Sequence, residues 1–136
     1  MQNVLLDTSP VVAFIDSSDT NHLRCLDFLK NFNGILYSTE AVLTESLYLL
    51  NDYFSNQKNC FEFFFNAVHL VPANKESLDR TMKLMDKYQD TPMDFADATL
   101  VAMAEEIECA TIFTLDRRGF ETYRWGRNKP FKIFPE

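Results

Sequence analysis

The sequence predicts an α/β fold with three layers, in which helices cover both faces of a central, mostly parallel sheet of about five short strands. Short apolar runs alternate with longer segments of helical periodicity, and this alternation is typical of strand–helix–strand units. The chain has 136 residues, 46% of them hydrophobic, so it can bury a substantial core, and its 3 glycines leave no stretch that resembles a linker. We therefore expect a single domain over residues 1–136.

The candidate strands are five short apolar runs, and two of them stop abruptly at an aspartate. One run, 4–6, ends at Asp7, and another, 111–115, ends at Asp116. Parallel strands end at a shared edge of the sheet, where open α/β sheets bind their ligands, so we expect the two carboxylates to meet there. The other three candidate strands are residues 35–37, 69–72 and 131–134.

The segments between these runs carry helical patterns and start signals. Ser9 and Pro10 suit the cap and first turn of one helix, and Ser38 or Thr39 suits the cap of another. Asn74 suits the cap of a third. Besides the helix that starts at Ser9 and Pro10, the expected helices are residues 20–32, 39–54, 59–68, 74–88 and 92–108.

The start of the last of these helices is the most informative. Thr91 can act as its N-cap, Pro92 suits the first helical position, and Asp94 falls where a capping box places an acidic partner. Asp94 and Asp97 are three residues apart, so both carboxylates lie on one face of the first turn, where the helix dipole favours negative charge. Either these aspartates only cap the helix, or they belong to a site at the edge of the sheet.

The charge of the chain is strongly acidic but unevenly distributed. A net charge of −7 argues against bulk, non-specific binding to nucleic acid. Between Arg117 and Lys132, however, only Glu121 is acidic, so a local phosphate-binding strip is compatible with the composition. The candidates for phosphate contacts are Arg117, Arg118, Arg124, Arg127 and Lys129; the alternative is a solvated face.

Cysteine and histidine usage excludes several other classes of site. Cys25, Cys60 and Cys109 form no C-x-x-C pair, so we expect buried free thiols rather than disulfides or a zinc site. His22 and His69 stand alone and are not expected to be catalytic.

No apolar run is long enough to cross a membrane, and the N-terminus carries no signal-peptide pattern, which predicts a cytoplasmic protein.

Glu45 is a further carboxylate that needs an explanation, because its neighbours on the helix surface are apolar. It is either paired with a cation or faces water at the edge of the apolar stripe. If it joins the aspartates, five carboxylates converge and repel one another unless a divalent cation compensates them. Oxygen ligands without histidine or cysteine suit Mg²⁺ or Mn²⁺, and such a cleft suits phosphodiester hydrolysis. The five carboxylates are Asp7, Glu45, Asp94, Asp97 and Asp116.

Four motifs in this order resemble the PIN-domain nucleases, and most of all the small, single-domain VapC-like ribonucleases. They are Leu-Leu-Asp-Thr-Ser at 5–9, Glu45 in a helix, Asp-Phe-Ala-Asp-Ala at 94–98, and Thr-Leu-Asp-Arg-Arg-Gly-Phe at 114–120. Each motif alone is weak, but their order and spacing extend over residues 1–134. The resemblance implies a PIN-like fold and a Mg²⁺- or Mn²⁺-dependent endoribonuclease.

The resemblance also assigns roles to individual residues. It implies Asp7, Glu45, Asp97 and Asp116 as the catalytic acids; Asp7, Asp97 and Asp116 would bind the metal, with Asp94 as an auxiliary ligand. It matches Thr8 and Thr114 to small hydroxyl positions beside this acidic site. We expect these two residues, together with Arg117 and Arg118, to bind the substrate. The implied partners are an RNA substrate, a cognate antitoxin if the protein is a toxin, and a second copy in a homodimer.

Two alternatives stay open from the sequence. One is a non-catalytic PIN-fold module that binds RNA or docks a protein; the complete set of acids argues against it. The other is a phosphatase of haloacid dehalogenase type. That family has Asp-x-Asp after the first strand, whereas Thr8 and Ser9 follow Asp7 here.

Three aromatic residues near the basic segment could stack on a base of the RNA or pack in the core: Tyr123, Trp125 and Phe131.

Overall fold

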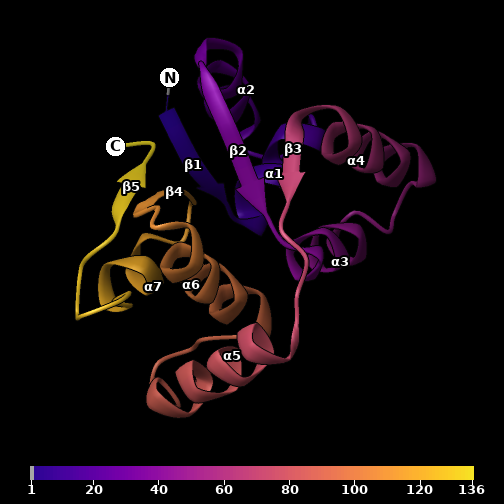
Figure 1. Ribbon diagram of the computed structural model, residues 1–136. Helices are drawn as coiled ribbons and strands as arrows, with labels where there is room; N and C mark the ends of the chain where they lie inside the picture. Colours follow the sequence, from indigo (N-terminus) through magenta and orange to yellow (C-terminus); the bar gives the residue numbers. More distant parts are fainter. Residues whose placement is uncertain (1) are drawn as a thin grey trace.

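The computed structural model describes residues 2–136, and strands and helices alternate along the chain as the sequence predicts (Figure 1). The strands are β1 (Gln2–Leu6), β2 (Gly34–Ser38), β3 (Val68–Leu70), β4 (Thr111–Phe113) and β5 (Lys132–Phe134). The helices are α1 (Thr8–Ile15), α2 (His22–Asn31), α3 (Glu40–Leu49), α4 (Phe54–Ala67), α5 (Lys75–Lys87), α6 (Phe95–Ile107) and α7 (Arg117–Thr122).

The five strands form one sheet in the order β3-β2-β1-β4-β5, and every pair in it is parallel. Val4, Leu5 and Leu6 of the central strand β1 are completely buried, as expected for a parallel strand covered on both faces. In the register, Leu5 lies opposite Ile112 and Leu6 opposite Phe113 of β4. The predicted α/β architecture, with helices flanking a parallel sheet, is confirmed.

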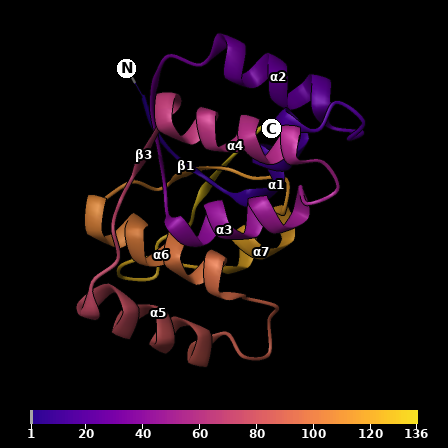
Figure 2. The same ribbon diagram turned by 90° about the vertical axis from the view of Figure 1, so that its right-hand side faces the viewer.

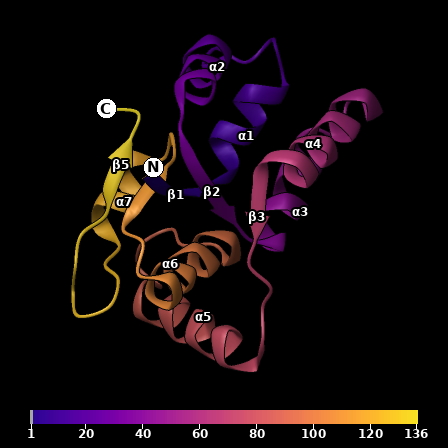
Figure 3. The same ribbon diagram turned by 45° about the horizontal axis from the view of Figure 1, so that its top comes forward.

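The strand order creates a switch point between β1 and β4. From β1 the chain moves outward through β2 to β3, then returns to the other side of β1 to form β4 and β5. Right-handed crossovers then place α1 to α4 on one face of the sheet and α5 to α7 on the other (Figures 2 and 3). At such a point the two connections diverge and leave room for a site beyond the carboxyl ends of the strands.

Among the helices that begin at residues other than those predicted, α1 and α6 do so because an aspartate caps the helix. Asp7 caps α1, so this helix starts at Thr8 rather than at Ser9 and Pro10. Asp94 caps α6 and accepts a hydrogen bond from the Asp97 backbone, so Pro92 precedes the helix. Aspartate is a favourable N-cap, because its side-chain oxygen accepts hydrogen bonds from the unpaired backbone N–H groups of the first turn.

The segment 39–54 was also predicted as one helix and is not. Thr39 caps α3 as expected, but α3 ends at Leu49, and Phe54 opens α4 instead of closing α3. Hydrophobic periodicity continued through the break, which concealed it. The basic segment after Asp116, for which the sequence analysis predicts no helix, forms the short helix α7, with the aspartate as its cap.

The core is rich in aromatic side chains that join the sheet to its helices. Phe113 of β4 is fully buried, and its ring centroid is 4.2 Å from that of Phe28 on α2. All three cysteines are buried free thiols, as predicted. Within the described part of the chain, no helix is long and apolar enough to span a membrane.

Candidate active site

Two of the predicted acids, Asp7 and Asp116, flank the switch point and are linked by one threonine. Asp7 follows β1 directly and is only 4% exposed; its Oδ1 accepts the Thr8 N–H at 2.7 Å. The Thr114 hydroxyl, at the end of β4, donates to Asp7 Oδ2 at 2.7 Å and accepts the Asp116 N–H at 2.9 Å. Thr114 is completely buried, so its side chain has little freedom to move and holds Asp7 and Asp116 in place relative to each other.

The first turn of α6 brings two more carboxylates to this edge. Asp94 Oδ1 accepts the Asp97 N–H at 2.9 Å, and Asp97 Oδ2 accepts the Asp94 N–H at 3.4 Å. This reciprocal pair is a capping box, but not the predicted one: Asp94 is the N-cap and Asp97 its partner, whereas the sequence suggested Thr91 as the cap and Asp94 as the partner. Capping fully occupies neither carboxylate: Asp94 is exposed and Asp97 half-buried. The two predicted roles, helix cap and site residue, are therefore compatible.

Glu45, in the second turn of α3, joins the cluster from the opposite side. Repulsion from Asp94 and from Asp7 acts on its half-buried carboxylate, which places Glu45 beside both. The buried Thr8 hydroxyl lies close to the Glu45 carboxylate and lowers its pKa as a hydrogen-bond donor would, but no well-formed hydrogen bond joins this hydroxyl to any residue from 2 to 136. A buried hydroxyl that is only loosely engaged, next to a carboxylate, is a group that can turn to an external ligand.

The carboxylates repel one another, and their protonation shows it. Burial, reinforced by the charges of Asp116 and Asp94, raises the pKa of Asp7 to about 6, although Thr114 and Thr8 oppose the shift. Burial and the charge of Asp94 raise the pKa of Glu45 to about 7. Burial and the charge of Asp7 raise the pKa of Asp97 to about 8. Without a cation, this site therefore holds protons that isolated carboxylates would have released.

Tyr123 is a buried residue in contact with the acidic cluster, and the sequence did not reveal this position. Its side chain is completely buried, and its hydroxyl donates to the Pro92 carbonyl and lies 3.4 Å from Asp97 Oδ2. Burial and the charges of Asp97 and Asp116 raise its pKa far above the usual value, so the phenol stays protonated. Because this contact joins α6 to the end of α7, no local motif marked the tyrosine; as a base-stacking candidate it belongs instead to the core.

The basic segment is divided between structural and unengaged side chains. Arg117 pairs with Glu121 at 3.4 Å and donates to the Pro135 carbonyl, and Arg124 donates to the last carbonyls of α7. In the described residues, no hydrogen bond or ion pair involves the Arg118 guanidinium, which is exposed one residue into α7. Arg118 is therefore the better placed of the two predicted arginines for a phosphate.

The remaining candidates of this segment lie farther along it. Lys129 Nζ lies 4.7 Å from the ring centroid of the half-buried Trp125, and Arg127 is exposed. Phe131, like Tyr123, is buried in the core and is not available to stack a base. Trp125 is partly exposed, so among the three aromatic candidates it alone remains available to stack on a base.

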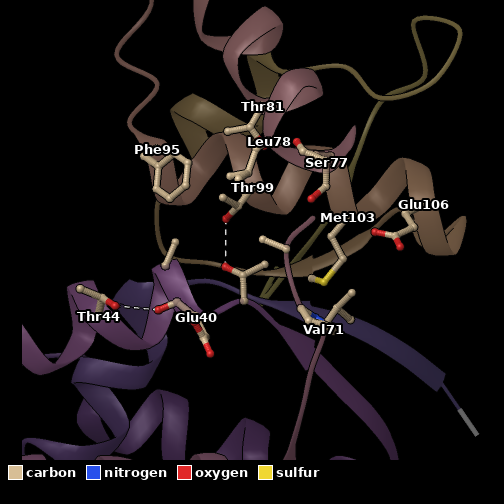
Figure 4. A pocket seen from close by; sticks show the side chains of 15 residues that line it. Glu40, Thr44, Val71, Ser77, Leu78, Thr81, Phe95, Thr99, Met103 and Glu106 are labelled. Carbon is tan, nitrogen blue, oxygen red and sulfur yellow. Dashed lines mark hydrogen bonds between the residues drawn. The ribbon is translucent and has the colours of Figure 1, made fainter. Parts of the chain in front are cut away.

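A cavity of about 270 Å³ lies between α3, α5 and α6, and none of the five carboxylates lines it (Figure 4). Among its lining residues, the hydroxyls of Thr39 and Thr99 are 2.9 Å apart, and Figure 4 draws this hydrogen bond as a dashed line from Thr99. This hydrogen bond ties the cap of α3 to α6 and so helps to fix the two helices that carry Glu45 and Asp97.

The donor set fits a hard divalent cation held through few direct ligands. Among residues 2–136, no three His, Cys, Asp or Glu side chains are close enough together to form a ready-made ligand set. Mg²⁺ keeps several waters and binds proteins through one or two carboxylates, so it does not need such a cage. A hydrated cation would offset the mutual repulsion of the acids, and one of its water molecules could bind the Thr8 hydroxyl.

A parallel sheet with acidic side chains at its switch point defines the class of protein: an α/β protein with an acidic cluster at the carboxyl edge of its sheet. More narrowly, the chain belongs to the PIN domain family, which matches it over residues 4–126. The predicted resemblance to this family is thereby confirmed.

The chain is similar to two VapC proteins and to a chain of a toxin–antitoxin complex. Ribonuclease VapC26 of Mycobacterium tuberculosis is 25% identical over 97% of this chain and 100% of its own length. The crystal structure of Mycobacterium tuberculosis VapC20, a sarcin–ricin loop cleaving toxin, superposes with a TM-score of 0.78 at 16% identity, over 84% of this chain and 90% of VapC20. A toxin–antitoxin complex from Klebsiella pneumoniae contains a chain with a TM-score of 0.65 at 14% identity, over 88% of this chain and 91% of that one.

Proposed function

We propose that this protein is an endoribonuclease that hydrolyses RNA phosphodiester bonds at the acidic cluster and uses Mg²⁺ or Mn²⁺. The observation that carries the proposal is the convergence of five carboxylates from distant parts of the chain on one edge of the sheet of a PIN-family protein. Carboxylates kept close at this electrostatic cost are typical of functional sites. The name of the relative VapC26, a ribonuclease, supports RNA as the substrate.

Asp7 and Asp97 are the first candidates to hold the cation, with Asp116 and Asp94 as further ligands. Asp7 is rigid because both of its oxygens accept hydrogen bonds, from Thr8 N–H and from Thr114. When bound, the ion would lower the pKa of a water molecule and polarise the phosphoryl oxygens. Its positive charge would also draw the raised pKa values of the acids back down, so that they serve as anions.

Glu45 is suited to take the proton of the attacking water. Its pKa of about 7 is close to neutrality, where a general base works best, and it faces Asp7 and Asp94 across the cluster. The loosely engaged Thr8 hydroxyl beside it is available for a non-bridging phosphate oxygen, and the Arg118 guanidinium for a neighbouring phosphate. In this scheme Glu45 takes a proton and Thr8 and Arg118 bind the substrate, and none of these roles requires a change in the fold.

We also propose two protein partners. The resemblance to a chain of a toxin–antitoxin complex supports a cognate antitoxin. The exposed aromatic surface of α4 supports a homodimer: Phe65 is 74% exposed, and its ring lies 5.9 Å from that of Phe61. We further propose that the protein acts in the cytoplasm, where an RNA substrate is available. The competing function is a non-catalytic PIN-fold module, which the presence of all four catalytic acids disfavours.

A cleavage assay combined with a thermal melt tests the proposal. We expect the protein to cut a structured RNA, such as a hairpin with the sarcin–ricin loop, in Mn²⁺ or Mg²⁺ and to stop in chelator without unfolding. An ion that binds only the folded state raises the free energy of unfolding by roughly 2.7 kcal/mol at a hundredfold excess over its Kd. If the ion neither shifts the melt nor affects RNA, and several RNA substrates stay intact, the non-catalytic reading replaces the enzyme.

A further inference from the structure

The hydroxyl of Tyr123 occupies the point where three segments of the acidic site meet. It donates to the carbonyl of Pro92, which leads into α6, and it lies 3.4 Å from Asp97 Oδ2. A Cβ atom added at Gly119 of α7 would lie 3.2 Å from this hydroxyl and 2.6 Å from Asp116 Oδ2. The phenol is thus packed below Asp97 and next to the turn that holds Asp116.

The tyrosine itself is fixed by an aromatic cluster. Its ring centroid is 5.2 Å from that of Phe120 and 5.2 Å from that of Tyr88, both in edge-on contacts. The hydroxyl therefore has little freedom, and its single proton has two acceptors within reach, a backbone carbonyl and a carboxylate. The contact with Asp97 Oδ2, at 3.4 Å, is the longer of the two, but it bears on a carboxylate oxygen that among residues 2–136 otherwise accepts only the Asp94 N–H, also at 3.4 Å.

We propose that Tyr123 is a positioning residue of this site, whose hydroxyl orients the Asp97 carboxylate toward Asp7 and so prepares it to bind the divalent cation. The inference rests on the proposed function, since it assumes that Asp97 is a ligand of the ion. The tyrosine itself touches neither ion nor RNA. It acts as the outer hydrogen-bonding partners of metal ligands do, by fixing the ligand's direction.

The chain offers a matched control for removing this hydroxyl. Tyr88 is in the same aromatic cluster, and its hydroxyl accepts a hydrogen bond from the Arg124 backbone N–H at 2.9 Å, away from the acids. Tyr123→Phe and Tyr88→Phe therefore delete the same atom from neighbouring rings. Both should lower the melting temperature by similar amounts, since each leaves one buried polar group without its partner.

Mn²⁺ titration calorimetry without RNA separates the two roles. For Tyr123→Phe we expect the Mn²⁺ dissociation constant to rise by about tenfold, and for Tyr88→Phe by less than about twofold. In the cleavage assay, Tyr123→Phe should lower kcat and leave KM for RNA unchanged. If Tyr123→Phe binds Mn²⁺ as the wild type does, the hydroxyl is merely structural and the inference is overturned.

A second measurement needs neither ion nor RNA. In chelator, the effect of Tyr123→Phe on the midpoint of urea unfolding should shrink when Asp97→Asn is also present, while the effect of Tyr88→Phe should be unchanged by Asp97→Asn. Additive effects in both pairs would overturn the inference. A wild-type protein that fails to bind Mn²⁺ or to cut RNA would instead refute the proposed function, and the unfolding comparison would still decide whether Tyr123 acts on Asp97.

Discussion

The Thr114 hydroxyl donates a 2.7 Å hydrogen bond to Asp7 Oδ2 and so joins the end of β4 to the carboxylate that follows β1. The two residues are 107 positions apart in the chain. Because the same hydroxyl accepts the Asp116 N–H, one buried side chain fixes the relative position of two acids of the site. Charge-assisted hydrogen bonds of this kind are stronger than neutral ones.

Replacing this hydroxyl by a methyl group should damage both stability and the site. We expect Thr114→Val, which keeps the side-chain shape, to destabilise the protein by about 1–3 kcal/mol, because it leaves a carboxylate oxygen and an N–H group buried without a partner. It should also raise the pKa of Asp7 further, since the Thr114 hydrogen bond lowers it. Urea unfolding and carboxyl NMR titration measure the two effects. Thr114→Ser retains the hydroxyl and should restore most of both.

Removing one charge from the cluster should abolish cleavage without unfolding the chain. Asp7→Asn and Asp97→Asn each delete a proposed ligand of the ion, but each also relieves the repulsion that raises the pKa values of the remaining acids. The melting temperature in chelator should therefore hold or rise, while activity on RNA disappears. A variant that unfolds would show that the carboxylate is structural, and full activity would remove the residue from the site.

Stability of the ion-free protein should fall as the pH rises through the neutral range. The pKa of Asp7 is raised from 3.8 to about 6 in the folded protein, and those of Glu45 and Asp97 to about 7 and about 8. A raised carboxyl pKa stabilises the fold below the unfolded-state value, and this contribution is lost as the pH rises through the folded-state pKa.

The loss should be complete above about pH 8, and for the buried Asp7 alone it amounts to about 3 kcal/mol. Thermal melts in chelator between pH 5 and pH 8.5 check this expectation. Asp97→Asn should flatten the dependence, and saturating Mn²⁺ should reverse it, because the ion favours the ionised acids. A melting temperature that rises with pH in chelator would contradict the electrostatic account of the cluster.

The two arginines at the start of α7 should contribute unequally to RNA binding. Each phosphate contact to single-stranded RNA contributes about 0.7 to the slope of log affinity against log salt, so Arg118→Ala should reduce that slope by roughly this amount. Arg117→Ala should have a smaller effect, because Arg117 already pairs with Glu121. Lys58→Ala, at an exposed position on α4, makes the same change in net charge and should leave the slope unaltered. Equal slopes for all three variants would mean that α7 does not contact RNA.

Local patterns in the sequence were sufficient to predict the fold and most of the acidic cluster. The apolar run of β1 and its end at Asp7 follow from burial on both faces of a parallel sheet, and the Asp94–Asp97 spacing follows from capping chemistry. The predicted site residues stay predictions until the variants are measured. Errors fell where a local signal was continuous or ambiguous, as in the break between α3 and α4 and the start of α6 at Phe95.

By itself, therefore, the sequence determined most of the strands and helices and which acids follow the strands, because hydrophobic periodicity and capping act over a few residues. It missed the start of α4 and the short helix α7. Only the tertiary structure decided that β4 lies beside β1, which makes the switch point where Asp7 and Asp116 meet. It also decided that Thr114 is committed to Asp7 and that Tyr123 lies below Asp97. Contacts between residues far apart in the chain depend on how whole elements pack, and no spacing within one segment encodes them.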